Sequence, residues 1–339
     1  MLNKITNNLF LLILVLAISS VVSFRSYDGT NERNDTSVYF QAFKCQATTQ
    51  EYISCDKKLG NTGDFIYSVT SYLFAIILNG NFDIFLLIIS MFINYYILKF
   101  VFVYSPMPLV SLLFLLSHYR FWDFSANALR AGIALTILLY IFSNPKIVDR
   151  YLKYNILYRL LPIAAHFSLI PTLLINQSNI KRIYLLLIVA TVLFISQYFF
   201  EIMALFESFG ILPSKLEYYI HIAKKALVAE KVSYISLLIF IMGIVMKNAI
   251  YGKRLLIWNS FILFFIVSLI MSPLGLGYRY FSFSLPFISI LLSIYVTYIL
   301  GFFHENLRFL IICIIHIGFT CWAIFMGIHN YDLFLIQIG

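Results

Sequence analysis

Apolar runs follow one another along almost the whole chain, and their length limits what it can fold into. The runs Ile84–Tyr104 and Leu255–Met271 together contain a single charged residue, Lys99. A helix that crosses a bilayer needs about 20 mostly apolar residues, so these runs indicate transmembrane helices. Inside the hydrocarbon, only helices and closed barrels satisfy every backbone hydrogen bond. Because the runs are continuous and do not alternate, the sequence predicts an all-α integral membrane protein.

The composition supports a protein that crosses the membrane many times. Of the 339 residues, 61% are hydrophobic and 12% are charged, whereas soluble domains have about 45–50% apolar and about 25% charged residues. We predict a polytopic protein with about 9–11 hydrophobic helices, some of them short re-entrant or interfacial segments. It is expected to form one transmembrane domain over residues 1–339, with outer loops at 25–64 and 206–231.

The net charge of +9 has a topological explanation. In a soluble protein it would indicate a nucleic-acid partner. Here most of the excess lies in short loops between apolar runs, where Lys and Arg mark the cytoplasmic side. We therefore expect a lipid bilayer, and no nucleic acid, as the partner. The run Leu9–Phe24, preceded by Lys4, is read as the first membrane helix, with a cytoplasmic N-terminus.

The four cysteines fall into two pairs, and no motif for a cofactor or metal accompanies them. Cys45 and Cys55 lie in the first outer loop, where an oxidising compartment would favour a disulfide between them. Cys313 and Cys321 lie in the last apolar run and are expected to be buried membrane residues. The sequence has no Walker loop, GxGxxG, HExxH or GxSxG motif, so we predict no cofactor and no metal.

Two segments do not fit a simple crossing. Phe65–Leu78 has about fourteen residues, too few for a span, which favours a re-entrant or interfacial helix at the outer face. Asn155–Asn176 contains Pro162 and Pro171 and has basic residues on both sides, so a single crossing would place one basic cluster outside. Two half-helices that meet near His166 would avoid this, and such breaks occur where they line a cavity or pack within protein.

Polar and charged side chains gather between Ser117 and Ser168. The run Leu109–Phe121 is predicted to return to the outer face, which places Arg120 and Arg130 there. A charged group at membrane depth costs roughly 2.5–3.5 kcal/mol and usually faces a cavity, a partner or a ligand. We interpret this stretch as the anion-binding and catalytic wall of a membrane enzyme.

Arginines are the candidate anion-binding residues. Arg130 is the strongest, because its guanidinium presents five donors in a fixed plane suited to phosphate. The alternative is an interfacial arginine that extends toward lipid headgroups. Arg279 follows a glycine-containing stretch at the outer start of a helix, where glycine permits close backbone approach. Arg120 has a similar location, and Asn127 is expected to share a helix face with Arg130 by the i, i+3 rule.

Histidines are the candidate acid–base residues. His166 can accept a proton from a hydroxyl group near neutral pH. The alternative is a histidine that only forms a hydrogen bond within a helix packing surface. His118 is the competing base, and Asp35 and Asp123 are candidate carboxylate partners.

Short motifs in a fixed order give the chain a family resemblance. They are D-x-x-x-Y-x-x-x-F, a span that ends near K-x-x-x-x-Y-S-P, N-x-x-R-x-G-x-A, and A-x-H-F-S. With these motifs the chain resembles the EpsG-like family of Wzy-type polysaccharide polymerases over nearly its whole length. The family's usual glutamine after the arginine is replaced by Ala131. The matching residues are Asp35, Tyr39 and Phe43; Lys99 to Pro106; Asn127, Arg130, Gly132 and Ala134; and Ala164 to Ser168.

The resemblance implies an inner-membrane glycosyltransferase with a GT-C-like architecture. Such an enzyme joins oligosaccharide repeat units carried on undecaprenyl diphosphate into O-antigen or capsule, on the periplasmic face and without nucleotide sugars. Arg130 and Arg279, with Arg120 and Asn127, would bind the lipid diphosphate, and His166 or His118 would act as base beside Asp35. A chain-length regulator and a flippase of the same pathway would be its protein partners.

Three other readings are compatible with the same residues. A flippase or other transporter of lipid-linked sugars would favour paired repeats with matching broken helices, and only one broken segment is visible. Another membrane transferase, such as an O-antigen ligase or a sugar O-acyltransferase, also sets a histidine in a broken helix. A non-enzymatic scaffold would leave the arginine and histidine at membrane depth without a purpose.

Overall fold

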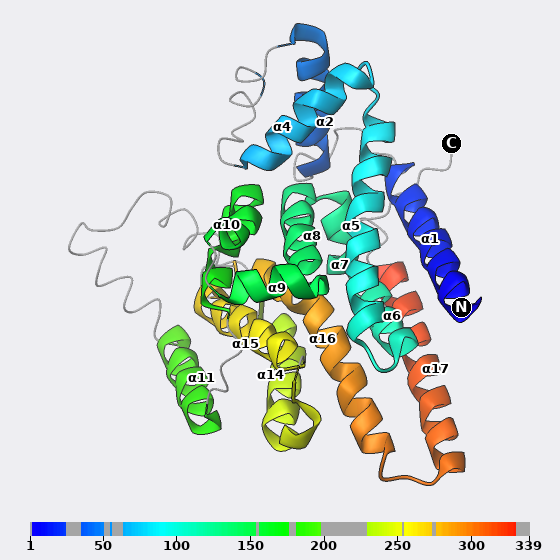
Figure 1. Cartoon of the computed structure of the whole chain (residues 1–339), viewed down its shortest axis with the longest axis vertical. Coiled ribbons are helices and arrows are strands. Elements are labelled where there is room, and N and C mark those ends of the chain that lie inside the picture. Colours follow the sequence, from blue (N-terminus) through cyan, green and yellow to red (C-terminus); the bar gives the residue numbers. More distant parts are fainter. Residues whose placement is uncertain are drawn as a thin grey trace, which may run out of the picture. The chain divides into compact units, whose positions relative to one another are not determined.

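The regular structure is helical throughout the part of the chain that can be described (Figure 1). The computed structural model describes residues 2–24, 35–50, 55, 64–153, 156–175, 181–197, 229–252, 254–272 and 276–329. The predicted all-α class is confirmed. The predicted outer loop at 206–231 lies outside these residues except for its end, and so do three parts of the loop at 25–64, namely 25–34, 51–54 and 56–63.

Three of the described helices are long and apolar enough to cross a membrane: α5 (Phe82–Tyr104), α15 (Arg254–Met271) and α16 (Gly277–Leu300). The mean hydropathy of each is 2.0 or 2.1, so a polytopic membrane protein is confirmed. A fourth span would result if Arg120–Ala126 and Leu129–Ser143, which meet at an angle of 104°, crossed together.

The helices group into two compact units. The first comprises residues 1–103, 112–170 and 309–339, and the second comprises residues 104–111 and 171–308. Helices of the first unit include α1 (Leu2–Ser23), α2 (Asp35–Thr49), α4 (Phe65–Ile77), α5, α7 (Tyr119–Ala126), α8 (Leu129–Ser143), α9 (Pro145–Leu152) and α10 (Ile156–Ala165). Those of the second include α11 (Arg182–Gln197), α14 (Ala229–Val245), α15 and α16, while α6 (Pro108–Leu116) and α17 (Glu305–His329) contain residues of both.

Helix α2 lies within the predicted outer loop at 25–64, where the sequence analysis expected no helix. It packs against α4 near the start of α5, where Phe43 is fully buried and its ring lies 4.7 Å from that of Phe85 (Figure 1). Tyr39 and Phe43 are four residues apart, so they share one face of the helix. The D-x-x-x-Y-x-x-x-F motif contains this i, i+4 pair, but the polar residues around it favoured a loop over a helix. Cys45 on the same helix is joined to Cys55 by a disulfide, as predicted.

The predicted span Leu109–Phe121 does not form one continuous helix. Helix α6 ends at Leu116 after nine residues, which at 1.5 Å per residue is about 14 Å, too short to span the hydrocarbon. Side chains form hydrogen bonds with the carbonyl groups at the end of α6. The Trp122 indole donates to the carbonyl of Leu116 at 3.0 Å, and the Ser117 hydroxyl donates to that of Phe114 at 2.7 Å. The chain therefore turns into α7 and does not continue as one helix.

The predicted short and broken segments are confirmed. Helix α4 has 13 residues, and the segment around His166 consists of α10, which ends at Ala165, and a 3-10 helix at Phe167–Leu174. Prolines lie inside both pieces, Pro162 and Pro171. Since proline removes a backbone donor and crowds the preceding turn, the chain cannot continue as one regular helix here. At the other end of the chain, Cys313 is half-buried and Cys321 is exposed on the protein, so neither is a core residue, and their place within the membrane stays a prediction.

In the second unit, α15 and α16 are joined by a short connection and pack closely together. A methyl group on Gly277 would lie 2.6 Å from the backbone oxygen of Ser268, and the Ser268 hydroxyl donates to the Gly277 carbonyl at 2.7 Å. Serines make a further contact within this unit: the hydroxyl of Ser105 lies 2.7 Å from that of Ser293 on α16. Small and hydroxyl-bearing residues allow such close approach in membranes, where apolar burial does not drive helices together.

The contact between α7 and α8 depends on Gly132. A Cβ atom at this position would overlap the backbone oxygen of Phe124 and lie 2.8 Å from the Ile93 side chain on α5. The absence of a side chain therefore lets α8 approach both neighbours, which fixes the start of α8 and the arginine that it carries.

Replacing Gly132 by Ala is expected to destabilise the protein by about 1–3 kcal/mol, because the added methyl group meets backbone that cannot move aside freely. The thermal unfolding midpoint of purified protein in detergent measures the effect. Gly318→Ala on α17 is the matched control, since a Cβ there meets no atom within 4 Å. Equal midpoints for the two variants would contradict the close packing of α7 and α8.

Candidate functional site

A single carboxylate joins two of the predicted site residues. Asp64 lies directly before α4, and its side chain is only 8% exposed. One of its oxygens accepts a hydrogen bond from the Arg130 guanidinium at 2.8 Å, and the other lies 3.0 Å from Nδ1 of His166. We call Tyr39, Asp64, Arg130 and His166 the Asp64 cluster. All four belong to the first unit.

Arg130 is held from two sides. It is the second residue of α8, and its Nε donates to the hydroxyl of Tyr39 on α2 at 3.1 Å. The guanidinium also lies 5.7 Å from the centre of the Tyr39 ring, within the range of a cation–π contact. With its side chain 25% exposed, this arginine is fixed by protein groups and still reaches the surface. The geometry does not match an arginine that extends freely toward headgroups.

His166 lies at the break between α10 and the following 3-10 helix. The helical turn is closed by its backbone NH, which donates to the Pro162 carbonyl at 3.0 Å. When Nδ1–H donates to Asp64, the lone pair is on Nε2, which is the arrangement a general base needs. The side chain is 19% exposed.

The shared carboxylate brings together residues from two separately predicted segments. The sequence analysis placed Arg130 at the outer face and His166 in the broken segment Asn155–Asn176. Since Asp64 contacts both, the two side chains lie at the same level, near the N-terminal end of α8. The break in the helix makes this possible, because its first half, α10, packs against α8 and ends near the start of α8.

Electrostatics keep the carboxylate charged and the phenol neutral. Burial raises the pKa of Asp64, but hydrogen bonds and charge from His166 and Arg130 outweigh it, and the pKa is lowered. For Tyr39, burial outweighs the opposing effect of Arg130 and raises the pKa to about 12. Tyr39 therefore remains a phenol at neutral pH. The cluster then combines a fixed cation, a carboxylate and an imidazole.

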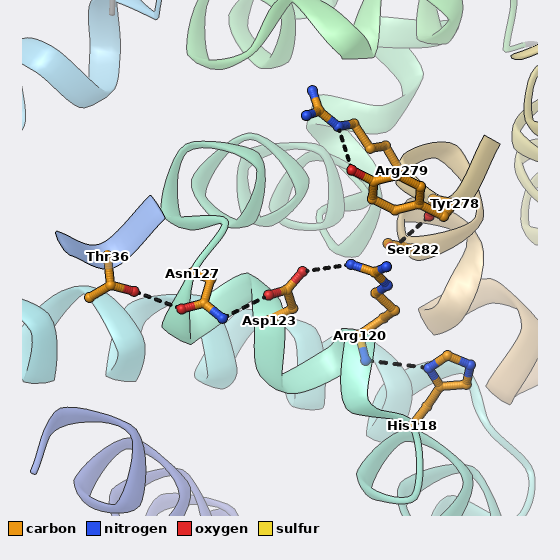
Figure 2. A network of polar contacts seen from close by, with 8 residues as sticks. All are labelled: Thr36, His118, Arg120, Asp123, Asn127, Tyr278, Arg279 and Ser282. Atoms are coloured by element: carbon orange, nitrogen blue, oxygen red, sulfur yellow. Dashed lines mark hydrogen bonds and ion pairs between the residues drawn. The ribbon is translucent and has the colours of Figure 1, made fainter. Parts of the chain in front are cut away.

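The remaining predicted residues of this region form a second polar network (Figure 2). The Arg120 guanidinium donates to Asp123 at 3.1 Å, and the Asn127 amide donates to the other Asp123 oxygen at 3.1 Å. The Thr36 hydroxyl lies 2.7 Å from the Asn127 carbonyl oxygen. Asn127 thus faces α7 and α2 and does not share a face with Arg130. The i, i+3 rule fails here because the chain bends by 104° between α7 and α8.

His118 has a structural position. It is the N-cap of α7, where its Nδ1 accepts a hydrogen bond from the backbone NH of Arg120 at 3.4 Å (Figure 2). Burial, with the positive charge of Arg120, lowers the pKa of His118 to about 4. Such a histidine is neutral but a weak base near pH 7, so His166 is the better candidate base.

Comparison with protein families adds one finding. The EpsG family model matches residues 8–336. The chain belongs to the EpsG family. No curated protein and no solved structure matches it. Membership of the EpsG family makes it a membrane protein of polysaccharide biosynthesis, in a family associated with glycosyltransferase-like polymerases. In this EpsG-family chain, Tyr39, Arg130 and His166 come from three of the sequence motifs and meet at Asp64.

Two further predicted site residues of this EpsG-family protein, Arg279 and Asp35, are not members of the Asp64 cluster as defined above, and each has its own surroundings. Arg279 belongs to the second unit, is exposed on α16, and donates to the Tyr278 hydroxyl at 3.3 Å (Figure 2). Asp35 opens α2, one turn before Tyr39, where its charge raises the pKa of that phenol. The residues that the structure describes contain no group of three or more His, Cys, Asp or Glu that could hold a metal ion.

Asp64 itself was missed by the sequence analysis. A signal was present: it is an acidic residue directly before the short apolar run that became α4. A carboxylate at the mouth of an apolar helix needs a cation or a solvated position for the same reason that Arg130 does.

Asp64→Asn should lower the thermal unfolding midpoint at pH 7, because the amide cannot balance the Arg130 charge. The folded pKa of Asp64 lies below its ordinary value of about 3.9, so its stabilisation is present above that pH and is lost as pH falls through the folded pKa. The difference between wild type and variant is therefore expected to shrink below about pH 4. Asp149→Asn, an exposed carboxylate on α9, is the control. A difference that stays constant down to pH 3 would be inconsistent with this pairing.

Proposed function

We propose that this EpsG-family protein is a Wzy-type polysaccharide polymerase. It would transfer an oligosaccharide from undecaprenyl diphosphate to a hydroxyl group of an acceptor glycan, at the periplasmic face of the bacterial inner membrane. The observation that carries the proposal is the contact of one carboxylate, Asp64, with both Arg130 and His166. This contact sets a phosphate-binding cation and a proton acceptor a few ångströms apart.

The guanidinium of Arg130 would bind the diphosphate. Two of its N–H groups donate to Tyr39 and Asp64, and the other three have no partner among the described residues. A guanidinium already held in place loses little further freedom when it binds an anion, and charge-assisted bonds to phosphate are strong. As the bond between sugar and diphosphate breaks, its electron pair stays on the phosphate oxygen, where Arg130 stabilises the developing charge.

His166 would remove the proton of the acceptor hydroxyl. The hydroxyl oxygen forms the new bond to the sugar carbon, and its proton moves to Nε2 of His166. Asp64 holds Nδ1–H, orients the ring and stabilises the imidazolium that forms. Tyr39 positions Arg130 and touches neither reacting group in this scheme.

The location of the cluster fits chemistry at a membrane surface. The Tyr67 ring on α4 lies 5.1 Å from the Tyr39 ring and 6.5 Å from Phe85, in the first turn of the candidate span α5. The cluster therefore lies beside the end of a membrane helix, where a lipid-anchored diphosphate would be found. We place this end in the periplasm, with a flippase that supplies the substrate and a regulator of chain length as partners.

Arg130→Ala is expected to abolish polymer and leave the single-repeat product, with a loss of about 10²–10³-fold or more, as for removal of one donor to a developing anion. Arg130→Lys keeps the charge but not the planar fork, and should restore only part of the ladder. Gels of surface polysaccharide from a deletion strain complemented with each variant provide the readout. Arg150→Ala on α9, an exposed arginine, is the matched control.

The same gels distinguish a polymerase from the alternative functions. A normal ladder from Arg130→Ala would refute the assigned role. Loss of even the single-repeat band in the deletion strain would indicate a flippase or a ligase. An unchanged ladder with altered acetyl content would indicate an O-acyltransferase.

His166→Ala should lower the polymerisation rate by about 10²–10⁴-fold, the usual contribution of a general base. With purified protein and lipid-linked substrate, the acidic limb of the wild-type pH–rate profile, which reports the general base, should be absent from the residual activity of His166→Ala. His118→Ala is the comparison, since loss of a helix cap is expected to reduce stability and leave the pH profile unchanged. An acidic limb that survives in His166→Ala would assign the base to another group.

A further inference from the structure

A second polar site lies at the opposite end of α4 from Asp64. It is an open depression of about 380 Å³ between α2 and the turn that joins α4 to α5. At 1.5 Å per residue the 13 residues of α4 span about 20 Å, so the depression and the Asp64 cluster are separate. Its principal lining residues are Phe40, Lys44, Asn79, Gly80, Asn81 and Asp83.

The floor of the depression is a rigid turn. Helix α4 ends in a Schellman motif, in which the NH of Gly80 donates to the Ala75 carbonyl at 2.9 Å and that of Asn79 to the Ile76 carbonyl at 3.2 Å. Asn79 and Gly80 both have positive φ, 50° and 73°, a conformation that asparagine and glycine tolerate best.

The same turn is fixed against both neighbouring helices. A Cβ on Gly80 would lie 3.1 Å from that of Ala47, so the missing side chain lets the turn approach α2. Asn81 then caps α5, since its side-chain oxygen accepts a hydrogen bond from the NH of Ile84 at 3.2 Å. The polar groups of this site are therefore arranged before any ligand arrives.

The chemistry of the lining favours a neutral ligand rich in hydroxyl groups. Lys44 and Asp83, both exposed, contribute opposite charges, so the site as a whole does not attract an anion. Lysine and asparagine amide groups donate, while carboxylate and amide oxygens accept, which suits a sugar hydroxyl that does both. Phe40 adds a partly exposed ring beside the Lys44 ammonium, 5.6 Å from the ring centre.

We propose that this depression binds an uncharged saccharide segment of the glycan, at a distance from the reacting hydroxyl group. The identity of the glycan rests on the function proposed above, whereas saccharide binding here does not require activity. Helix α2 links the two places, because it carries Tyr39, which contacts Arg130, as well as Phe40 and Lys44. A glycan of several sugars would reach from one to the other and be held between successive additions.

The binding experiment uses the full-length protein in nanodiscs. The probe is a set of oligosaccharides of defined repeat number, released by mild acid from the strain's own surface polysaccharide. Lys44→Gln/Asp83→Asn should weaken their binding by about tenfold or more, the loss expected when charged partners of hydroxyl groups are removed. Lys146→Gln/Asp149→Asn, the same changes at exposed positions on α9, should bind like wild type.

Two results would overturn the proposal. One is equal affinity of the depression variant and wild type. The other is displacement of the bound oligosaccharide by inorganic phosphate, which would make this an anion site. Unfolding midpoints show whether each variant is folded, and the single change Lys44→Gln at an exposed side chain serves if the double variant is not.

A second readout separates this proposal from the proposed function. Arg130→Ala should keep oligosaccharide binding and lose polymerisation, whereas Lys44→Gln/Asp83→Asn should lose oligosaccharide binding and shorten the modal chain length of the polymer. If Arg130→Ala polymerises normally and binding still depends on Lys44 and Asp83, the assignment of Arg130 fails and the saccharide site stands. If Lys44→Gln/Asp83→Asn binds the oligosaccharides as tightly as wild type while Arg130→Ala loses polymer, the saccharide site is refuted and the proposed function stands.

Discussion

Pairing of the buried charge on Asp64 is the interaction on which the first unit depends. A carboxylate with so little contact with water is stable only if cations and hydrogen-bond donors surround it. Arg130 and His166 supply these from α8 and from the end of α10, and Tyr39 on α2 fixes the arginine from its other side. Four segments that are far apart in the sequence are thereby brought to one point. Removing any partner leaves a buried charge unbalanced, which links the integrity of the site to the packing of these helices.

Three local features support this arrangement: a glycine in α8, a proline in α10 and a disulfide on α2. Gly132 lets α8 approach α7 and α5, which sets the position of Arg130 two residues earlier. Helix α10, which contains Pro162, ends at Ala165, and the partly buried imidazole of His166 follows at the break beside Asp64. The Cys45–Cys55 disulfide ties α2 to a residue nine positions before Asp64 in the chain. Each feature acts on the backbone, so the side chains at the centre require little reorganisation when a ligand binds.

The sequence revealed the helices and the unusual residues, but not how those residues pair. Apolar run length identified α5, α15 and α4, and proline with basic flanks identified the break at His166. Arg130 and His166 stood out because charge in an apolar environment needs compensation. Asp64 did not, because its partners lie 66 and 102 residues away and no local pattern encodes such a contact. The role of Asn127 was misjudged for a related reason: helical spacing assumes one axis, and the axis changes between α7 and α8.

The presence of a carboxylate inside a proposed diphosphate site has a chemical consequence. Asp64 repels an incoming anion, which costs affinity, but only two of the Arg130 N–H groups hold the arginine, and the other three have no partner among the described residues. In the proposed mechanism Asp64 holds the Nδ1–H of His166, while Nε2 takes the proton of the acceptor hydroxyl. The imidazolium that forms and the departing diphosphate would then stabilise each other, because their opposite charges develop in the same step.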